Sequence, residues 1–513
     1  MATQTAVTKG GGGDAMNKKR YEGRLTPYVL CTVAVATCLS LAGGYQINIA
    51  GGVSAMDSFL KEFFPDVYRG RRSKNNYCRY EDQFLQFYTS SLYLAALLSC
   101  ITTPYPSRVW GRRKTILLSG IIFMVGTCIG AGALNIGMLL SGRILQGLAI
   151  GMSVQIAPVY IAEMAPAHAR GALMGTIEVS FSFGIFAAGI TSYKAETIDP
   201  WGWRLALGMA GVPGMVWLLG GIFLPDTPAS TLQRGYPEKA REILERIRGT
   251  PDVDLEFQHI TEAVHKAHSV TFDFRALTQR RYRPQMIVGV CIPFFFQMTG
   301  ANAVSFYAPV FFRSMGLGAK SSLYSNAIIG GVKVMSAALA VRFVDRWGRK
   351  NLLYEGGIQM FVSLITIGAL LQYQLDLHDP PSRVVAICVV VVFCVYVSGF
   401  TWSWSSLAMV IPGEIFPLEI RSAAMSLNGF CLYIVGFNIA QWFYVILCGM
   451  RFGIFYFFAF WIAVMTIFVF ALVPETKGVG LERTPVLFEQ HWFWRRFVPS
   501  SLEAQQTKVQ DNL

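Results

Sequence analysis

The segment RVWGRRKTILLSG, residues 108–120, returns in altered form as VDRWGRKNLLYEG at residues 344–356. Two further pairs of segments repeat in the same order. EMAPAHARGA (163–172) matches EIFPLEIRSA (414–423), and LPDTP (224–228) matches VPETKG (473–478). Each copy follows its partner by about 240 residues, and such ordered matches indicate an internal duplication. The repeat therefore predicts two related halves.

Long apolar stretches separate these motifs. Of the 513 residues, 53% are hydrophobic and 15% are charged, against about 25% charged in an average soluble domain. Runs of about 20 apolar residues are long enough to cross a bilayer, and backbone in a bilayer core is satisfied by helices. The expected spans are 27–50, 84–106, 115–135, 137–160, 171–192, 203–224, 284–311, 322–344, 351–373, 383–411, 422–446 and 453–473. The sequence predicts an all-α membrane protein with 12 transmembrane helices.

The net charge of +13 is spread over short basic clusters between the apolar runs. This distribution is typical of cytosolic loops and argues against nucleic-acid binding. An even number of spans puts both termini on one side, which the clusters assign to the cytosol. The basic loop at 52–83 runs against that assignment, but longer loops cross largely regardless of charge.

The expected organisation follows from the spans. It comprises a cytosolic N-terminal tail (1–26), an N-terminal six-helix half (27–224) with a lid at 52–83, an intracellular helical loop (225–283), a C-terminal six-helix half (284–473) and a cytosolic C-terminal tail (474–513). Within the loop, the segment YPEKAREILERIRG (236–249) has Pro near its start and Gly at its end, which predicts a helix.

The repeated motifs and GGIQMF (356–361) resemble those of the sugar porter family of the major facilitator superfamily. The segments GGVSAMDSFLKEFFP (51–65), YCRYEDQ (77–83), QFYTSSLYLAAL (86–97), FYAPVFF (306–312) and EQHWFWRRFVP (489–499) are similar to plant-type sugar transport proteins, which are monosaccharide/proton symporters. The resemblance covers residues from about 20 to about 500. It implies a major facilitator fold with an extracellular lid helix, and transport of hexoses through the plasma membrane by alternating access. It also implies a monomer without a cofactor or a metal.

The resemblance further implies a sugar site lined by amides, which suit a neutral polyol. The pattern Q-Q-x-x-G-x-N of span seven is FQMTGAN here, with Phe296 at the first Gln and with Gln297 and Asn302 retained. Five other ligand positions hold different residues. They are Glu178 in place of Gln, Lys333 in place of Asn, Met409 in place of Trp, and Leu432 with Gly436 in place of Asn and Thr.

Glu178 and Lys333 are ionisable groups at membrane depth, where an unpaired charge is costly. One hypothesis is a direct ion pair between the two halves. The alternative is that each side chain lies alone in a wet cavity or reaches toward the membrane surface.

Gln46 occupies the position where the family has a proton-binding Asp facing an Arg, and that Arg is retained as Arg143. Because Gln46 cannot titrate, three possibilities stay open beside the symporter that the resemblance implies. The protein is an uncoupled facilitator, or Glu178 handles the proton, or the solute is different and possibly anionic, with a non-transporting sensor as a further option. We find no nucleophile–base constellation, metal cluster or nucleotide loop, so we expect no enzyme activity.

The repeated polar motifs predict a cytosolic gate made of charge-assisted pairs that hold the halves together. The alternative is that the basic residues only anchor loops in the cytosol. The candidate gate residues are Arg112, Arg113, Glu163, Arg170, Asp345, Arg346, Arg349, Glu414 and Arg421, with Lys350 beside them. The resemblance also implies a disulfide between Cys78 and Cys448, which would tie the lid to the second half; two separate thiols are the alternative.

Overall fold

The computed structural model describes residues 25–70, 78, 82–166, 169–269, 277, 279–314, 319–377, 383–408, 410–417, 420–476 and 484–497. A few side chains at the edges of these segments, and those of Asp345 and Arg421, lie outside the description. In the described part of the chain, twelve helical stretches are long and apolar enough to cross a membrane, which confirms the predicted number.

The membrane spans are single helices in nine cases and broken helices in three. The single helices are α2 (Pro27–Ala55), α5 (Gln83–Thr102), α7 (Arg112–Ala131), α8 (Ile136–Met164), α9 (Arg170–Ala195), α17 (Ala319–Trp347), α18 (Arg349–Leu377), α21 (Arg421–Met450) and α22 (Gly453–Leu472). The broken spans are α10 (Gly202–Gly208) with α11 (Gly211–Phe223), α15 (Arg283–Met298) with α16 (Ala301–Ser314), and α19 (Arg383–Gly399) with the π-helix η4 (Phe400–Ser405) and α20 (Val410–Ile415).

Side-chain caps set where several spans begin. The Thr26 hydroxyl accepts a hydrogen bond from the Val29 amide at 3.3 Å, and Pro27 occupies the first turn of α2. The Asp82 carboxylate accepts from the Leu85 amide at 2.8 Å to begin α5. These caps satisfy amides that have no partner within their own helix.

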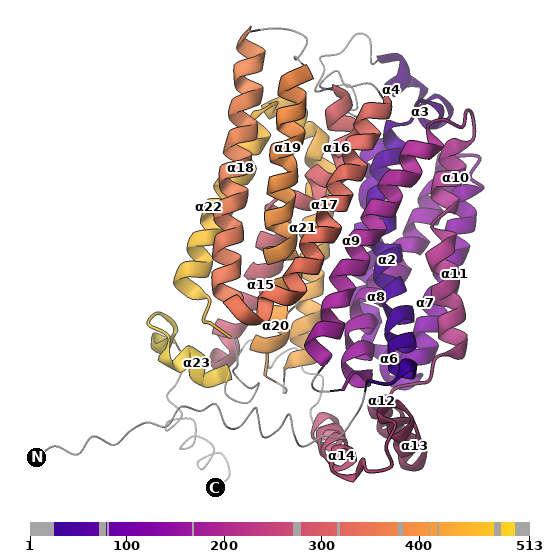
Figure 1. Cartoon of the computed structure of the whole chain (residues 1–513), viewed down its shortest axis with the longest axis vertical. Helices are drawn as coiled ribbons and strands as arrows, with labels where there is room; N and C mark the ends of the chain where they lie inside the picture. Colours follow the sequence, from indigo (N-terminus) through magenta and orange to yellow (C-terminus); the bar gives the residue numbers. More distant parts are fainter. Residues whose placement is uncertain are drawn as a thin grey trace, which may run out of the picture.

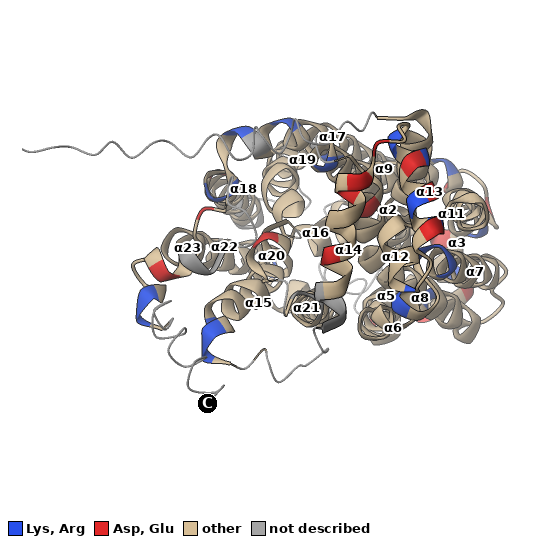
Figure 2. Ribbon diagram, turned by 90° about the horizontal axis from the view of Figure 1, so that it is seen from below, with Lys and Arg blue, Asp and Glu red and all other residues tan. Residues whose placement is uncertain are grey.

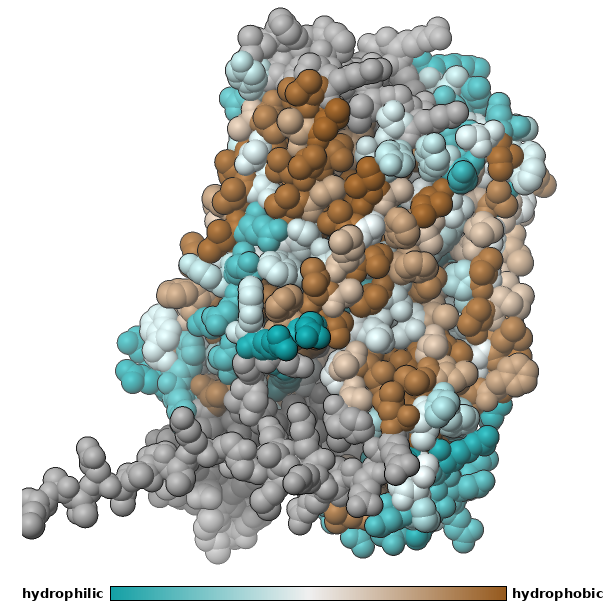
Figure 3. All heavy atoms as spheres, viewed as in Figure 1, coloured by the Kyte–Doolittle hydropathy of each residue, from teal (hydrophilic) through white to brown (hydrophobic). Residues whose placement is uncertain are grey.

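The helices stand side by side in one bundle with short helices at both ends (Figure 1). We call the end with α3 (Asp57–Phe63) and α4 (Pro65–Gly70) the lid face. The opposite end, with α12 (Pro228–Gln233), α13 (Pro237–Arg248) and α14 (Asp254–Ser269), is the loop face. Hydrophobic residues cover most of the middle of the visible flank, as expected for a surface in contact with lipid (Figure 3). Charged residues gather toward the loop face, on α13, α14 and α23 (Thr484–Gln490) among others (Figure 2).

The two halves meet along three pairs of helices: α9 with α17, α5 with α21, and α2 with α16. Small residues allow the helices of the first pair, α9 and α17, to approach each other closely. A Cβ added to Gly189 of α9 would lie 2.9 Å from Ala327 Cα, and one added to Gly330 of α17 would lie 2.7 Å from Phe186 Cα. Backbones at this separation are typical of membrane helices that pack through small residues.

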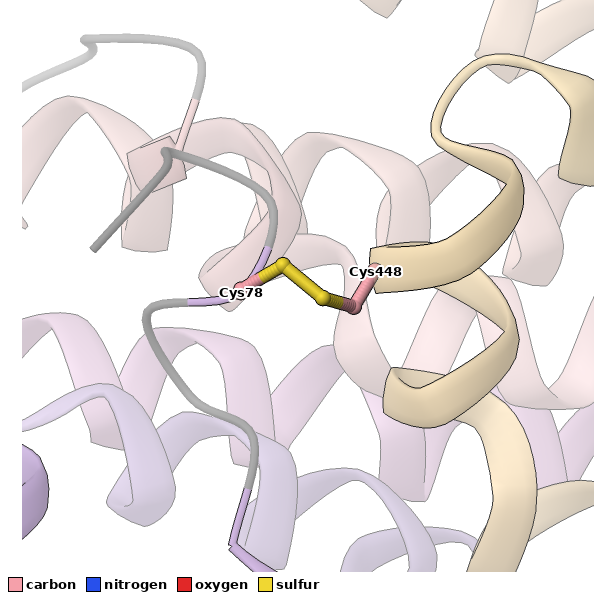
Figure 4. The surroundings of a disulfide bond; sticks show 2 residues. All are labelled: Cys78 and Cys448. Carbon is pink, nitrogen blue, oxygen red and sulfur yellow. A yellow bond between two sulfur atoms is a disulfide. The ribbon is translucent and has the colours of Figure 1, made fainter.

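The lid helix α3 is fixed to the first half. Phe59 and Phe63 pack against the Trp203 ring, with centroids 5.8 and 5.1 Å away. The Glu62 carboxylate accepts hydrogen bonds from the Trp203 indole at 3.0 Å and from Arg204 at 2.7 Å. A disulfide joins Cys78, which follows the lid helices, to Cys448 near the end of α21, as the resemblance implied (Figure 4). The lid region is therefore bonded to both halves.

Helix α13 confirms the predicted loop helix, since it begins at Pro237 and ends before Gly249, whose φ is 68°. Its last residue, Arg248, is buried and pairs with Glu256 of α14 through bonds of 2.8 and 2.9 Å. Arg248 also donates to the Met164 carbonyl at 2.8 Å, at the end of α8. This arginine attaches the loop helices to the membrane bundle.

Candidate transport site

Gln297 lies at the break in the seventh span, between α15 and α16. The break is at Gly300, where φ is 76° and where a Cβ would lie 2.7 Å from the Phe458 ring. The buried Gln297 amide donates to the Leu432 carbonyl of α21 at 3.1 Å. A Cβ on Gly436 would lie 2.7 Å from the same amide nitrogen, so glycine leaves room for it. Gln297, Leu432 and Gly436 therefore meet between the seventh and eleventh spans.

The other candidates on the seventh span lie on both sides of Gln297. The half-buried Phe296 packs against Phe400 of the π-helix η4, with ring centroids 5.1 Å apart. Asn302 is half-buried in the first turn of α16. Met409 falls outside the described residues. Phe296 thus contributes an aromatic face where an amide was expected.

Glu178 links the two halves, but through a different partner from the one predicted. Its Oε1 accepts a hydrogen bond of 2.6 Å from Ser405 at the end of η4. The buried Lys333 of α17 is close enough for its charge to act on the Glu178 carboxyl. Among the described residues, however, the two side chains form no contact of salt-bridge length. The predicted direct ion pair is absent from this structure, and the contact seen at the carboxylate is that of the Ser405 hydroxyl.

Gln46 and Arg143 lie together in the first half, both buried. Arg143 Nη1 is 3.0 Å from the Gln46 carbonyl oxygen and 3.0 Å from its side-chain Oε1. The guanidinium also lies over the Tyr88 ring, 5.4 Å from its centroid. Gln46 and Arg143 therefore face each other, as the resemblance implied, with a neutral amide beside the cation.

Several buried polar contacts close the bundle on the lid side of Gln297. The Thr89 and Tyr307 hydroxyls are 2.8 Å apart, and Ser90 donates to the Gln441 side chain at 2.6 Å. Each contact joins the first half to the second. The sequence analysis missed these residues, although a hydroxyl or an amide within an apolar span is a usable signal.

Asn48 and Asn326 form a further contact between the halves that the sequence analysis missed. Asn48 of α2 donates to the Ile185 carbonyl at 2.9 Å, and the Asn326 amide of α17 lies 3.4 Å from the Asn48 oxygen. Both side chains are buried. Two adjacent amides therefore face each other across the interface between the halves.

The repeated polar motifs form one cluster in each half at the loop face. In the first half, Arg112 pairs with Glu163 at 3.0 Å, and its backbone amide donates to the Asp226 carboxylate at 3.1 Å. Thr227 donates to the other oxygen of Glu163. The three motifs that repeat in the sequence therefore meet in space.

The second half repeats this cluster. Arg349 pairs with Glu414 at 3.0 Å, and its amide donates to Glu475 at 3.1 Å. The Thr476 hydroxyl donates to the second Glu414 oxygen at 2.5 Å. Arg349, Glu414, Glu475 and Thr476 correspond to Arg112, Glu163, Asp226 and Thr227.

These ion pairs lie within the halves rather than between them. Arg349 and Glu414 have further partners besides each other, so the role of the motifs in holding the halves together stays a prediction. Arg113 donates to the backbone carbonyls of Gly221 and Ile222, and Lys350 donates to the Phe470 carbonyl at 2.9 Å. These two cations cap the last span of each half instead of pairing with acids.

Less detail is seen for four other gate candidates. Arg170 begins α9 and is exposed at the loop face, and Arg346 is exposed near the end of α17. Both have partners among their surroundings. The side chains of Asp345 and Arg421 lie outside the described part of the chain, so their predicted roles stay predictions.

A family model described as "Sugar (and other) transporter" matches residues 31–488. The chain belongs to this family. Among its sugar-transporter relatives, Sugar transport protein 7 of Arabidopsis thaliana is 43% identical over 489 residues, which cover 95% of each chain. Sugar carrier protein C of Ricinus communis is 43% identical over 94% of each chain, and Sugar transport protein MST3 of Oryza sativa subsp. japonica is 43% identical over 97% of this chain and 96% of the relative.

Solved structures agree on the fold. The major facilitator superfamily proton:xylose symporter XylE, bound to 6-bromo-6-deoxy-D-glucose, superposes with a TM-score of 0.74 at 22% identity, covering 90% of this chain and 100% of that chain. An inward-open structure of the xylose transporter XylE from E. coli has a TM-score of 0.73 at 22% identity, with coverage of 90% and 99%. This sugar-transporter family member therefore has the major facilitator fold. It is a multi-pass membrane transporter and not an enzyme.

Proposed function

We propose that this protein carries a neutral monosaccharide, with hexoses as the first candidates, across the plasma membrane by alternating access. The lid face is outside, and the loop face and both chain termini are in the cytosol. The protein works as a monomer in the lipid bilayer. The proposed halves are residues 27–224 and 284–473, joined by the cytosolic loop at 225–283.

One observation carries the proposal. Gln297 offers an amide at the break of a discontinuous span in a sugar-transporter family chain. It lies next to the interface between the halves, because Gly436 packs against both the Gln297 amide and Tyr93 of the first half. Transporters of this kind bind their substrates near the middle of the membrane, where helices are broken. Amides both donate and accept hydrogen bonds, so Gln297, Asn302 and Asn326 suit sugar hydroxyls. Phe296 adds an apolar face for the ring of the sugar.

Uptake of labelled hexoses by cells without their own hexose carriers tests this function. The assay uses two external pH values, with and without a protonophore, and includes a pentose and a polyol. We expect saturable hexose uptake. No uptake of any sugar by protein shown to be at the cell surface would overturn the proposal.

The variant Gln297→Ala tests the proposed site. We expect the half-saturating sugar concentration to rise about tenfold, which corresponds to one lost hydrogen bond. Gln359→Ala is a matched control, because Gln359 donates to the Val395 carbonyl at 2.9 Å and to Ser398 at 3.0 Å, within the second half. Equal effects of the two variants would argue against a sugar site at Gln297.

An uncoupled facilitator is the second candidate, and the contact between Gln46 and Arg143 favours it. A neutral amide beside a buried guanidinium keeps the same charge at every physiological pH. Hexose uptake whose rate changes neither with external pH nor on addition of the protonophore would support the facilitator. Uptake abolished by the protonophore would support a symporter.

A further inference from the structure

Carboxyl groups are scarce in the membrane interior of this protein. The twelve stretches that are apolar enough to cross a membrane contain four acidic residues: Glu163, Glu178, Glu355 and Glu414. Glu163 and Glu414 lie in the last turn of their stretches. Glu178 lies eight residues after Arg170, the first residue of α9, so it is about 12 Å inside the loop face. Glu355 lies within the second half, on α18.

Glu178 is thus the interior carboxyl that joins one half to the other. Its oxygen accepts the 2.6 Å bond from Ser405, and Ser405 belongs to η4 in the second half. Lys333, also in the second half, is buried and acts on the carboxyl through its charge. A charged group at this depth is costly unless it has a partner or a function.

From the bonding of Glu178 we propose that this carboxyl takes up and releases the proton that is coupled to sugar movement. The inference rests on the proposed sugar transport and goes beyond it by assigning the proton site. When Glu178 is ionised, its charge attracts the Ser405 hydroxyl and the Lys333 ammonium and draws the halves together near the loop face. When a proton from solution binds a carboxylate oxygen, this attraction falls and the halves separate more easily there.

The proposed cycle requires no other reactant. The proton enters from the lid side together with the sugar, and it leaves the same oxygen on the loop side after the halves have separated. The ionised carboxylate then restores the contact with Ser405. The free energy that couples the proton to the sugar equals the difference between the two protonation states of Glu178 in how strongly the halves attract each other. Any linkage between two ligands requires such a difference.

The helices around α9 contain other titratable groups, and these groups have partners or stay neutral. On α17 the facing group is Lys333. On α2, the Tyr45 hydroxyl donates to the Ala206 carbonyl at 2.7 Å, and Cys38 is a half-buried thiol. On α10, Arg204 is paired with Glu62 at 2.7 Å at the lid face.

Two further charges lie on α8, which also packs against α9. Arg143 is bonded to Gln46, and Glu163 is bonded to Arg112. Among the residues that the structure describes, neither Arg143 nor Glu163 forms a hydrogen bond or an ion pair with Glu178. The carboxyl of Glu178 therefore remains the group whose charge changes at the interface between the halves.

Purified full-length protein in liposomes tests the inference with two assays. Counterflow of labelled hexose, without any gradient, measures transport itself. Accumulation driven by an inward proton gradient measures coupling. A gradient of about one pH unit supports up to about tenfold accumulation at one proton per sugar, because each tenfold ratio has the same free energy.

The decisive variant is Glu178→Gln, which keeps the shape of the side chain and removes the titratable group. We expect counterflow to continue and accumulation to fall to a ratio of about one, the equilibrium value. Glu178→Asp keeps a carboxyl and should recover part of the accumulation. Glu355→Gln is the matched control, since it also removes an interior carboxyl, and it should accumulate sugar like the wild type.

The outcomes separate the two claims. Absence of hexose counterflow by the wild type would overturn the proposed function. Counterflow without proton-driven accumulation by the wild type would overturn only the coupling. Accumulation that survives in Glu178→Gln would likewise overturn the role of Glu178.

A chemical measurement on the wild type covers the case in which Glu178→Gln does not fold. A hydrophobic carbodiimide reacts with protonated carboxyl groups in apolar surroundings. We expect mass spectrometry to locate the label on Glu178, with less label at higher pH and in the presence of hexose. Label that is absent, or that does not depend on pH, would overturn the assignment.

Discussion

Arg143 directs one guanidinium nitrogen at two oxygens of Gln46, the backbone carbonyl and the side-chain Oε1, each 3.0 Å away. An amide in this position supports the cation by hydrogen bonds but cannot neutralise it. Arg143 Nε and Gln46 Nε2 are both buried and have no hydrogen-bond partner among the described residues. The pair holds the helices α2 and α8 together without responding to pH.

Restoring an acid next to Arg143 should restore proton coupling when Glu178 is disabled. In the double variant Glu178→Gln/Gln46→Asp, the new carboxylate pairs with the guanidinium and can bind a proton. We expect proton-driven accumulation of hexose above the equilibrium ratio of about one, measured in liposomes. Glu178→Gln/Gln46→Asn is the control and should remain at equilibrium. Equal behaviour of the two double variants would mean that position 46 cannot couple in this chain.

The ion pairs at the loop face should be coupled within each half. A double-mutant cycle of Arg112→Gln and Glu163→Gln should yield an interaction energy of about 0.5–3 kcal/mol, as residues in contact do. The cycle of Arg349→Gln and Glu414→Gln should give a similar value, because its pair has the same 3.0 Å geometry. Thermal unfolding in detergent provides the measurement. The cross-half cycle of Arg112 and Glu414 is the control, and a coupling there as large as within one half would contradict the structure.

Gly111 should tolerate a methyl group poorly. Its φ is 89°, and a Cβ would lie 2.1 Å from Asp226 Oδ2. Gly235 has a similar φ of 85°, but a Cβ there would have nothing within 4 Å. We expect Gly235→Ala to cost about 1 kcal/mol through the backbone alone, and Gly111→Ala to lower the melting temperature further. Equal losses would show that the Asp226 carboxylate moves aside freely.

The destabilising effects of replacing Cys78 and Cys448 should not add up, because both substitutions remove the same disulfide. Cys78→Ser, Cys448→Ser and the double variant should each destabilise the protein by about 2–4 kcal/mol, because any of them removes the same cross-link. Unfolding without reductant measures the effect, and a reducing agent should bring the wild type to the level of the variants. Cys388→Ser, at an exposed free thiol, is the control. Losses that add up in the double variant would contradict a shared bond.

Much of the architecture could be predicted because the signals are local. Hydropathy alone predicted twelve spans, and Pro237 at the start with Gly249 after the end predicted the loop helix α13. The three repeated motifs predicted two equivalent halves. The structure adds that these motifs form one cluster, in which Asp226 and Glu475 bind the backbone amides of Arg112 and Arg349.

The site was harder to predict, since contacts between distant helices depend on their depth and rotation. The sequence indicated that Glu178 and Lys333 both lie at membrane depth, but not that Ser405 would reach the carboxylate. It likewise suggested acid–base pairs at the loop face without indicating that each pair stays within one half. The contact between Asn48 and Asn326 joins residues far apart in the chain and has no local pattern.

The sequence by itself determined the membrane class, the number of spans, the duplication and the neutral residue opposite Arg143. These properties follow from hydropathy, turn chemistry and side-chain identity, which each residue carries without its neighbours. Only the tertiary structure decided which groups face each other across the halves. A hydrogen bond such as that from Ser405 to Glu178 requires two helices to meet at one height and one angle, and the packing of the whole bundle sets both.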